Sequence, residues 1–339
     1  MQRKRALITG ITGQDGSYLA EILLEKGYFV TGMIRRSSSP STCRIEKLLA
    51  EKSIQLVEGD LADTHSLKHV LEVASPDEVY NLAAMSHVKS SFSIPEYTAD
   101  VNGVAVLRLL ENLKDTFPEA RFYQASTSEL FGKVTSFPQN EKTPFHPRSP
   151  YGIAKLFAFW SVVNYREAHG MYACNGILFN HESPRRGEEF VSRKISIAVA
   201  KIALGKQEKL VLGNLDAKRD WGYAKEFALG MWQMLQQEKA EDFVLATGKT
   251  HSVREFVIRA FEEVGIPLLW EGEGVQEVGL HSKTGKVLIE ISPQLFRPAE
   301  VDILLGDAFK AEKELGWKSE TSFEDLVSLM VKSDYKAFS

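Results

Sequence analysis

The sequence predicts an α/β protein in which a doubly wound parallel sheet is joined to a smaller, mixed α/β domain. Two observations carry this prediction. In the first half of the 339 residues, short β-rich runs alternate with helical patterns, which implies right-handed crossovers and a parallel sheet covered on both faces. After about residue 180 the alternation loosens into polar loops and shorter elements, which indicates a second domain.

The expected strands are short runs rich in β-branched and aromatic residues. In chain order they are RALITG, YFVTGMI, IQLVEGD, EVYNLAA, RFYQAS and ACNGILFN. Helices are expected between them at 17–26, 66–74, 104–113 and 154–168. The near-continuous apolar character of several runs suits strands that are buried on both faces.

The second half predicts a chain that crosses between two domains. A polar loop, HESPRRGEEF, precedes a helix expected around 191–204. A buried helix is expected at AKEFALGMWQMLQQ, and DFVLATG is a strand that could rejoin the edge of the first sheet. The tail from residue 251 mixes short helices with the strand-like run KVLIEIS. We therefore expect residues 1–178 and 219–249 to form one domain, interleaved with a second formed by 179–218 and 250–339.

The composition limits the classes of partner. A net charge of −4 gives no general attraction to nucleic acid or to acidic membranes. The two cysteines, Cys43 and Cys174, lie far apart, which fits free thiols in a reducing compartment. The N-terminus lacks the apolar region and cleavage site of a signal peptide, and no apolar run is long enough to cross a bilayer. We expect a cytoplasmic protein without nucleic-acid or membrane partners, and no metal site is predicted.

A glycine-rich turn follows the first expected strand. Gly10, Gly13 and Gly16 lie between that strand and a helix, where glycines permit a tight turn and close approach of the backbone to a pyrophosphate. The free N–H groups at the start of the helix favour phosphate charge. The alternative is an ordinary strand–helix turn, but the position at the first strand favours an NAD(P)-binding Rossmann domain.

Three later segments bear on the cofactor. The second strand ends in IRRSSS, where Arg35 and Arg36 suit a 2′-phosphate, whereas a site for NAD commonly has an acidic residue there. NADP is therefore favoured over NAD, and a solvated basic loop is the alternative. After the third strand, Asp60 could accept from the adenine amino group. After the fourth, the small residues of NLAAMSHV would let the cofactor lie close, although packing would explain either segment.

The catalytic prediction depends on three residues. Tyr151 and Lys155 lie at positions i and i+4, hence on one helix face, and a lysine ammonium beside the phenol would lower the pKa of the tyrosine. Such a tyrosinate is a general base for a substrate hydroxyl while hydride leaves its carbon. Thr127 could hold the same oxygen by a hydrogen bond. Each residue alone could occur by chance, but their combination behind a glycine-rich turn indicates a redox site.

Several motifs together resemble the GDP-mannose 4,6-dehydratase family, within the extended short-chain dehydrogenase/reductase superfamily. The glycine turn and the YxxxK pair are general features of the superfamily, whereas NHESPRRG with LGNLDAKRDWG is specific to this family. The resemblance runs from about Ala6 to ELGWK near the end of the chain. The other motifs that carry it are TGITGQDGSYLAE, NLAAMSHV, STSELFG, RSPYGIAK and FRPAEVDILLGD.

The resemblance implies a lyase that converts GDP-mannose to GDP-4-dehydro-6-deoxymannose and water, the first step towards GDP-fucose and other GDP-deoxysugars. Tyr151 would take the C4 hydroxyl proton while hydride passes to NADP, and Glu129 would remove the C5 proton. Glu129 is also the candidate acid for the departing C6 hydroxyl, and hydride would return to C6. Related dehydratases carry an Asp–Glu pair where this chain has Ser128 and Glu129, so the identity of that acid stays open.

The resemblance also implies the binding residues. His181 and Arg186 would lie against the cofactor, although His181 could be a purely structural histidine. The full cofactor set is Gly10, Thr12, Gly13, Gln14, Asp15, Gly16, Arg35, Arg36, Asp60, Leu61, Leu82, Ala83, Ala84, Ser86, Tyr97, Lys155, His181 and Arg186. The substrate set is Ser86, Asn180, Val191, Lys194, Leu212, Gly213, Arg219, Arg297 and Glu300.

Within the substrate set, Arg219 and Arg297 are candidates for the pyrophosphate because their forked donors match phosphate geometry. Surface salt bridges are the alternative for both. Glu300 could accept from the guanine N1–H and amino group. The loop at residues 35–44 is expected to reach a neighbouring subunit's cofactor site, with Arg44 buried at the interface of a homodimer or homotetramer.

Two other functions compete with this prediction. A nucleotide-sugar 4-epimerase or 4-keto reductase would share the scaffold, but neither needs a carboxylate at Glu129 to remove the C5 proton. A non-catalytic NADP-binding regulatory protein would have no reason to keep Thr127, Tyr151 and Lys155 in mutual register.

Overall fold

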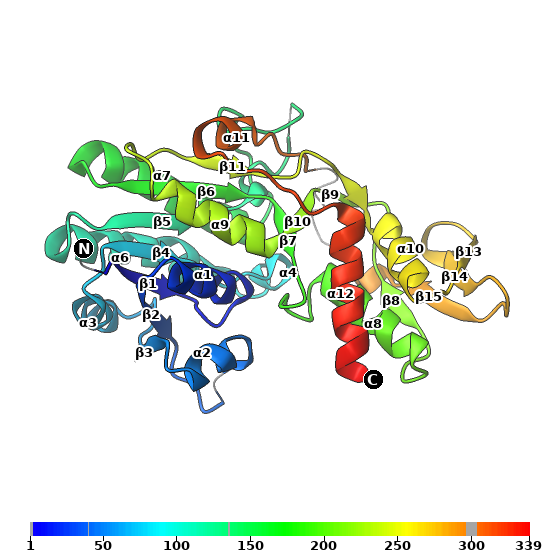
Figure 1. Ribbon diagram of the computed structural model, residues 1–339. Coiled ribbons are helices and arrows are strands. Elements are labelled where there is room, and N and C mark those ends of the chain that lie inside the picture. The colour runs from blue at the N-terminus through cyan, green and yellow to red at the C-terminus, as the bar shows by residue number, and fades with distance from the viewer. Residues whose placement is uncertain (1–2, 40, 135, 296–303) are drawn as a thin grey trace.

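The computed structural model describes residues 3–39, 41–134, 136–295 and 304–339. Its centre is a seven-stranded sheet in the order β11-β6-β5-β4-β1-β2-β3, with every neighbouring pair parallel (Figure 1). The chain winds outward from β1 in one direction and from β4 in the other, which confirms the predicted doubly wound sheet. The strands are β1 (Arg5–Thr9), β2 (Phe29–Ile34), β3 (Ile54–Glu58), β4 (Glu78–Asn81), β5 (Arg121–Ala125), β6 (Ala173–Leu178) and β11 (Phe243–Leu245).

Helices cover both faces of this sheet. One face packs against α1 (Gln14–Glu25), α2 (Glu46–Ala50), α9 (Ala224–Met234) and α11 (Phe309–Leu315). The other face packs against α3 (Thr64–Ala74), α6 (Ala105–Thr116) and α7 (Pro150–His169). Two short helices, α4 (Val88–Ser91) and α5 (Pro95–Ala99), follow β4. The helices predicted in this half are confirmed, and each begins within four residues of its expected start.

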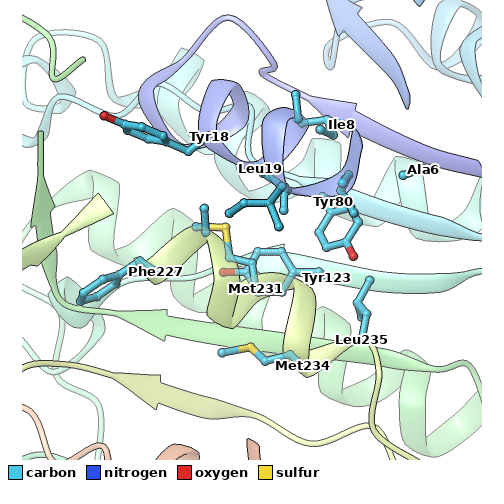
Figure 2. Packing of buried hydrophobic residues seen from close by; sticks show 14 of the residues in the cluster. Ala6, Ile8, Tyr18, Leu19, Tyr80, Tyr123, Phe227, Met231, Met234 and Leu235 are labelled. Atoms are coloured by element: carbon cyan, nitrogen blue, oxygen red, sulfur yellow. The ribbon is translucent and has the colours of Figure 1, made fainter. Parts of the chain in front are cut away.

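The strand sequences explain why both faces are buried. Neighbouring side chains of a strand point to opposite faces, so an apolar run serves two cores at once. In β1, Ile8 packs in the cluster under α1 and α9, whereas Leu7 packs in the cluster under α3 and α6. Figure 2 shows Leu19 of α1 and Met231 of α9 gathered with Tyr123 of β5 in the first of these clusters.

The second part of the molecule lies to one side of the large sheet (Figure 1) and has its own hydrophobic core. Its sheet has the order β13-β14-β15-β8, formed by β8 (Leu210–Leu212), β13 (Leu268–Glu271), β14 (Val278–His281) and β15 (Val287–Ile291). Its helices are α8 (Val191–Ala203), α10 (Val253–Glu263) and α12 (Phe323–Phe338). The tail was expected to hold only short helices. Instead α12 runs for 16 residues from the N-cap Ser322, because one apolar stripe packs on α8 and α10 along its length.

Two small sheets join the two parts. β9 (Lys218–Arg219) pairs with β12 (His251–Ser252), and β10 (Trp221–Tyr223) pairs in parallel with β7 (Asn180–Glu182). The prediction of a continuous polar loop from residue 181 was therefore wrong at its start. Its first two residues belong to β7, since a distant segment supplies the backbone partners.

The strand β11 rejoins the first sheet beside β6, as expected from DFVLATG. The domain boundaries remain a prediction, and α11 packs beside β11 and α9 rather than with α12. Across the described ranges, no helix combines the length and apolarity needed to cross a bilayer.

Candidate active site

A cavity of about 440 Å³ opens where the carboxyl ends of β4, β5 and β6 face the second part of the molecule. Loops after these strands supply one wall, and the starts of α7 and α8 supply another. Residues around β8 and β9 complete the lining. Ligands bind outside the carboxyl ends of strands in sheets of this kind, so the cavity lies where the fold predicts a site.

All four residues predicted to be catalytic line this cavity: Thr127, Glu129, Tyr151 and Lys155. Thr127 follows β5 and caps a short 3-10 turn, its Oγ1 accepting from the Glu129 backbone N–H at 3.2 Å. Glu129 is 9% exposed and Lys155 is 4% exposed. The structure therefore brings the four side chains to one shielded place.

N-terminal capping of α7 fixes the position of Tyr151, which lies in the first turn of that helix. The N-cap of α7 is Ser149, whose Oγ accepts from the Gly152 N–H at 3.0 Å, and Pro150 occupies the first turn. The Tyr151 N–H donates to Ser91 Oγ at 3.2 Å, which ties α7 to α4. The cap and the contact with α4 thus orient the helix face that carries Tyr151 and Lys155.

The electrostatics of Tyr151 differ from the sequence prediction. Burial raises the pKa of Tyr151 to about 12, and the Glu129 charge adds to the rise, whereas a hydrogen bond with Thr127 opposes it. Lys155 Nζ lies 5.9 Å from the Tyr151 ring centroid and donates to the Ala125 carbonyl at 2.9 Å. Burial lowers the pKa of Lys155 to about 8. Desolvation therefore outweighs the lowering of the Tyr151 pKa that was expected from the lysine.

The glycine turn has the close contacts that a dinucleotide site requires. Gly10 has φ +73°, and a Cβ there would lie 2.9 Å from the Ala83 backbone. A Cβ on Gly16 would lie 2.4 Å from the Gly10 carbonyl oxygen. α1 starts directly after Gly13, so its first N–H groups face this turn. No other residue fits Gly10 and Gly16 without moving the backbone, and this geometry fits a pyrophosphate cradle.

Asp15 links the cofactor turn to the NHESPRRG motif. Its Oδ2 lies 2.9 Å from His181 Nε2, and His181 Nδ1 bonds the Phe179 carbonyl at 2.7 Å. Although burial opposes both shifts, this pairing raises the pKa of His181 and lowers the pKa of Asp15. His181 also stacks on Phe227, with ring centroids 4.8 Å apart. The imidazole is thus held by the protein itself, and its contact with a cofactor stays a prediction.

Other residues of the predicted cofactor set follow the same edge of the sheet beyond the cavity. At the end of β2, Arg35 donates to the Tyr97 hydroxyl at 3.0 Å, and both side chains are exposed. After β3, Asp60 Oδ1 accepts from the Ala62 N–H at 2.9 Å, while Leu61 is buried in the core. The set is therefore ordered after β1, β2, β3 and β4 in turn, as one extended ligand would require.

The loop at 35–44 returns to its own chain. Arg44 Nε donates to the Arg185 carbonyl at 2.6 Å, and another guanidinium nitrogen donates to the Thr12 carbonyl at 3.3 Å. Arg44 therefore braces the cofactor turn and NHESPRRG from within one protomer. Its predicted burial at a subunit interface remains a prediction.

The predicted substrate residues line the other side of the cavity, as far as they are described: Ser86, Asn180, Val191, Lys194, Leu212, Gly213 and Arg219. Arg219 is 6% exposed, so it is not a surface salt bridge. Burial lowers the pKa of Lys194, in the first turn of α8. Arg297 and Glu300 lie outside the described residues.

Sequence reasoning missed several polar residues of the cavity. Glu182 is 2% exposed and Ser192 is 1% exposed, and both line it. Ser126 also lines it, with a buried hydroxyl for which the structure gives no hydrogen-bond partner. Strand periodicity could have found Glu182, because a strand at 180–182 puts it on the same face as Asn180. Within the described ranges, no three His, Cys, Asp or Glu side chains gather as metal ligands.

Comparison with known proteins agrees with this geometry. The sequence profile of the family described as GDP-mannose 4,6 dehydratase matches residues 7–330. The chain is 57% identical to the GDP-mannose 4,6-dehydratase of Sinorhizobium fredii (strain HH103), over 98% of this chain and 97% of that protein. The chain belongs to the GDP-mannose 4,6-dehydratase family. The human GDP-mannose 4,6 dehydratase is 56% identical over 98% of this chain and 91% of its own length. The family predicted from the motifs is confirmed.

Solved structures place this family member within a wider fold. A UDP-glucose 4-epimerase from Thermotoga maritima aligns with TM-score 0.82 at 23% identity, over 98% of this chain and 99% of that one. A dTDP-glucose 4,6-dehydratase from Bacillus anthracis aligns with TM-score 0.81 at 21% identity, over 98% and 97%. At this identity the likeness concerns the fold alone, and it confirms the predicted Rossmann architecture. The epimerase alternative therefore gains no support from it, whereas the family profile favours the dehydratase.

Proposed function

We propose that the protein converts GDP-mannose to GDP-4-dehydro-6-deoxymannose and water by moving hydrogen internally from C4 to C6. The observation that carries this proposal is the presence of Thr127, Glu129, Tyr151 and Lys155 in one shielded cavity of a GDP-mannose 4,6-dehydratase family member. A redox step alone would need the hydroxyl, the phenol and the lysine. The carboxylate adds the means to eliminate water.

Tyr151 is the base for the C4 hydroxyl. Burial raises its pKa to about 12, so the site needs groups that favour the tyrosinate. Thr127 already hydrogen-bonds the phenol, which stabilises the anion. Positive charge brought near the ring would lower the pKa further, and Lys155 is within 5.9 Å of its centroid. Thr127 and a nearby positive charge therefore both work against burial to activate the tyrosine.

Glu129 removes the C5 proton. Its charge raises the pKa of Tyr151, so the carboxylate lies near the phenol that handles the neighbouring carbon. Once C4 is a ketone the C5 proton is acidic, and a positioned carboxylate can take it. The same group, now protonated, can give that proton to the C6 hydroxyl as it leaves. Ser128 has no titratable group, so Glu129 is the candidate for both steps.

The proposed cofactor is NADP, which when bound would accept hydride from C4 and donate it to C6. Its pyrophosphate fits the turn at Gly10 and Gly16, where any side chain would clash. Arg35 and Arg36, both exposed at the end of β2, suit a 2′-phosphate. Chromatography of the nucleotide released from the denatured protein should give NADP. Release of NAD instead would contradict this choice.

The nucleotide end of GDP-mannose is proposed to bind near α8 and β9. Lys194 and Arg219 line this part of the cavity and would meet the pyrophosphate, with Asn180 beside them. Arg297 and Glu300 are proposed for the pyrophosphate and the guanine on the family pattern, because they lie outside the described residues. Weaker inhibition of Arg219→Met than of wild type by GDP would support the assignment.

Cytoplasmic location and self-association are also proposals. Cys43 is exposed and Cys174 is buried, and both are free thiols, which fits a reducing compartment. A homodimer or homotetramer with the 35–44 loop at the interface is the proposed assembly. Light scattering at the assay concentration should give a multiple of the chain mass. A fully active monomer would contradict it.

The reaction itself is best tested with GDP-mannose in deuterated water. Mass spectrometry should show a product lighter by one water, with solvent deuterium at C5 and the original C4 hydrogen at C6. Exchange at C5 without loss of water would indicate an epimerase-like enzyme instead. Cofactor binding without any turnover would favour a regulatory protein.

A further inference from the structure

Glu182 is a buried carboxylate that the mechanism above does not use. It ends β7, whose residues point alternately to opposite sides. His181 points towards Asp15 on the cofactor side, at 2.9 Å. Asn180 and Glu182 share the other side of the strand. The side chain of Glu182 lines the cavity although it is only 2% exposed.

The two oxygens of this carboxylate are used unequally. Oε2 accepts from the Ser192 hydroxyl and lies 3.1 Å from Arg186 Nε. In the described part of the chain, Oε1 receives no donor. A carboxylate can accept about four hydrogen bonds, so this group has capacity for a further donor. Such an oxygen at the wall of a cavity is suited to a donor from a ligand.

Arg186 shows which end of the cavity this oxygen serves. The guanidinium bound by Glu182 lies close enough to Tyr151 to lower its pKa, against the larger effect of burial. Arg186 also packs over the Phe190 ring, 3.7 Å from its centroid, at the start of α8. Glu182 is therefore paired with a guanidinium whose charge acts on Tyr151. Because Glu182 lines the same cavity as Tyr151 and Thr127, a ligand group that reaches Oε1 would be part of the hexose.

The chemistry leaves few candidates for that ligand group. Tyr151 and Thr127 engage O4, and O6 leaves with the help of Glu129. The hexose has two other hydroxyl groups, at C2 and C3, which do not react. We propose that Oε1 of Glu182 accepts a hydrogen bond from one of these two hydroxyl groups and so determines which hexose the enzyme accepts. This inference rests on the proposed function, which it deepens.

A carboxylate that is built to accept a hydroxyl rejects an analogue without it, because the buried oxygen is then left unpaired. The test compares GDP-mannose with its 2-deoxy and 3-deoxy analogues, by kcat/KM for loss of water. With wild type, one analogue should react about 10- to 100-fold more slowly than GDP-mannose. With Glu182→Ala, GDP-mannose should fall to a similar level, and that analogue should lose no more than about threefold further.

The ratio between substrates separates recognition from a structural role. If Glu182 only supported the first turn of α8, its removal would slow all three substrates equally and the wild-type ratio would persist. Ser192→Ala is the matched control, because it removes a partner of Oε2 and leaves Oε1 in place. It should keep the wild-type ratio. If Glu182→Ala does not fold, Glu182→Gln should still reduce the ratio at least threefold.

Two results would overturn the inference. One is a wild-type enzyme that treats both deoxy analogues like GDP-mannose. The other is an unchanged ratio in Glu182→Ala or, should that variant not fold, in Glu182→Gln. A rise in the NADP dissociation constant with an unchanged ratio would assign Oε1 to the cofactor. Failure of the proposed function gives a different result, since wild type would then release no water from GDP-mannose itself.

Discussion

The central sheet has one edge at the amino-terminal ends of its strands and another at their carboxyl-terminal ends. Both edges bury polar side chains, but these differ in how far the protein itself satisfies their hydrogen bonds. At the amino-terminal edge, Glu78 is fully buried and accepts hydrogen bonds from four side chains at 2.7 to 3.2 Å. The donors are Lys4, Tyr28, Tyr80 and Gln236. Three of them come from other segments of the chain, so the carboxylate fastens β4 to its surroundings. Its acceptors are filled by the protein.

At the carboxyl-terminal edge, buried polar side chains could form more hydrogen bonds than the structure gives them. Among the described residues, the donors of Glu182 reach Oε2 and not Oε1, and the buried Ser126 hydroxyl has no hydrogen-bond partner. Lys155 donates to a single carbonyl although an ammonium has three donors. The chain itself satisfies the buried polar group at one edge, and we expect a ligand to satisfy those at the other.

The largest effect is expected from Glu129→Gln. Loss of the general base should lower dehydration by about 10³-fold, within the range of such catalysis. Oxidation at C4 should persist, because Thr127 and Tyr151 are untouched, and NADPH should accumulate. Stopped-flow absorbance of NADPH and mass spectrometry of the product measure the two steps.

Glu78→Gln is the matched control, since it makes the same change at the other edge and should leave both steps intact. Undiminished product formation by Glu129→Gln would refute its assignment as the base.

The second effect is on stability, at Glu78. Glu78→Ala should lower the free energy of unfolding by about 3 kcal/mol, because buried donors lose their acceptor. The kcat/KM of the folded fraction should equal that of wild type, since the cavity lies at the opposite edge. Urea unfolding and steady-state kinetics provide the measurements. A variant as stable as wild type would show that this network does not fasten the sheet.

The smallest expected effect is on the free energy of unfolding when a lysine is replaced by methionine. It should have opposite signs at Lys155 and Lys4. Burial holds the pKa of Lys155 near 8, so between pH 8 and 10.5 the unfolded chain keeps a proton that the folded chain has lost. Stability at this site therefore rises with pH across that window, and Lys155 is most destabilising below it. Lys155→Met should raise the free energy of unfolding at pH 7 by about 2 kcal/mol while abolishing turnover, because the roughly 3 kcal/mol gained from the removed pKa shift is partly offset by the lost hydrogen bond to the Ala125 carbonyl. The gain should vanish above pH 10.5.

Lys4 provides the contrast. Although its own desolvation works against it, the hydrogen bond and charge of Glu78 raise the pKa of Lys4. Lys4 therefore stabilises the folded protein at neutral pH, and this stabilisation is lost as the pH rises through the pKa of Lys4 in the folded state. Because this side chain is half-exposed, Lys4→Met should destabilise by less than about 1 kcal/mol at pH 7. Urea titrations at pH 7 and above pH 10.5 compare the two variants, and equal signs would break the contrast.

Much of the fold could be predicted from local patterns. The seven strands of the large sheet could be predicted because their apolar runs pack against cores on both faces. The glycines indicated the first turn. The return of β11 was also predicted from its composition. The strand β7 was missed because the residues of Asn180–Glu182 are polar, and only the distant β10 stabilises them as a strand.

The sequence predicted four residues that the structure brings into one cavity, but it could not predict their electrostatics. A spacing of four residues puts Tyr151 and Lys155 on one helix face, yet it does not reveal how deeply they are buried. Depth decides the pKa of both groups here. Arg44 is a similar case, because the sequence could not tell which carbonyls its guanidinium would find.

The late return of β11 restricts how the protein can be made. β6 ends at Leu178, and its outer partner begins only at Phe243. A nascent chain that has left the ribosome as far as β6 therefore exposes an unpaired strand edge, and the face of α1 that packs on α9 is bare. A fragment cut at residue 178 would keep every glycine of the cofactor turn but would lack the cover for its own sheet. The cofactor-binding half is completed by the segment that first passes through the other half, so the two are produced together.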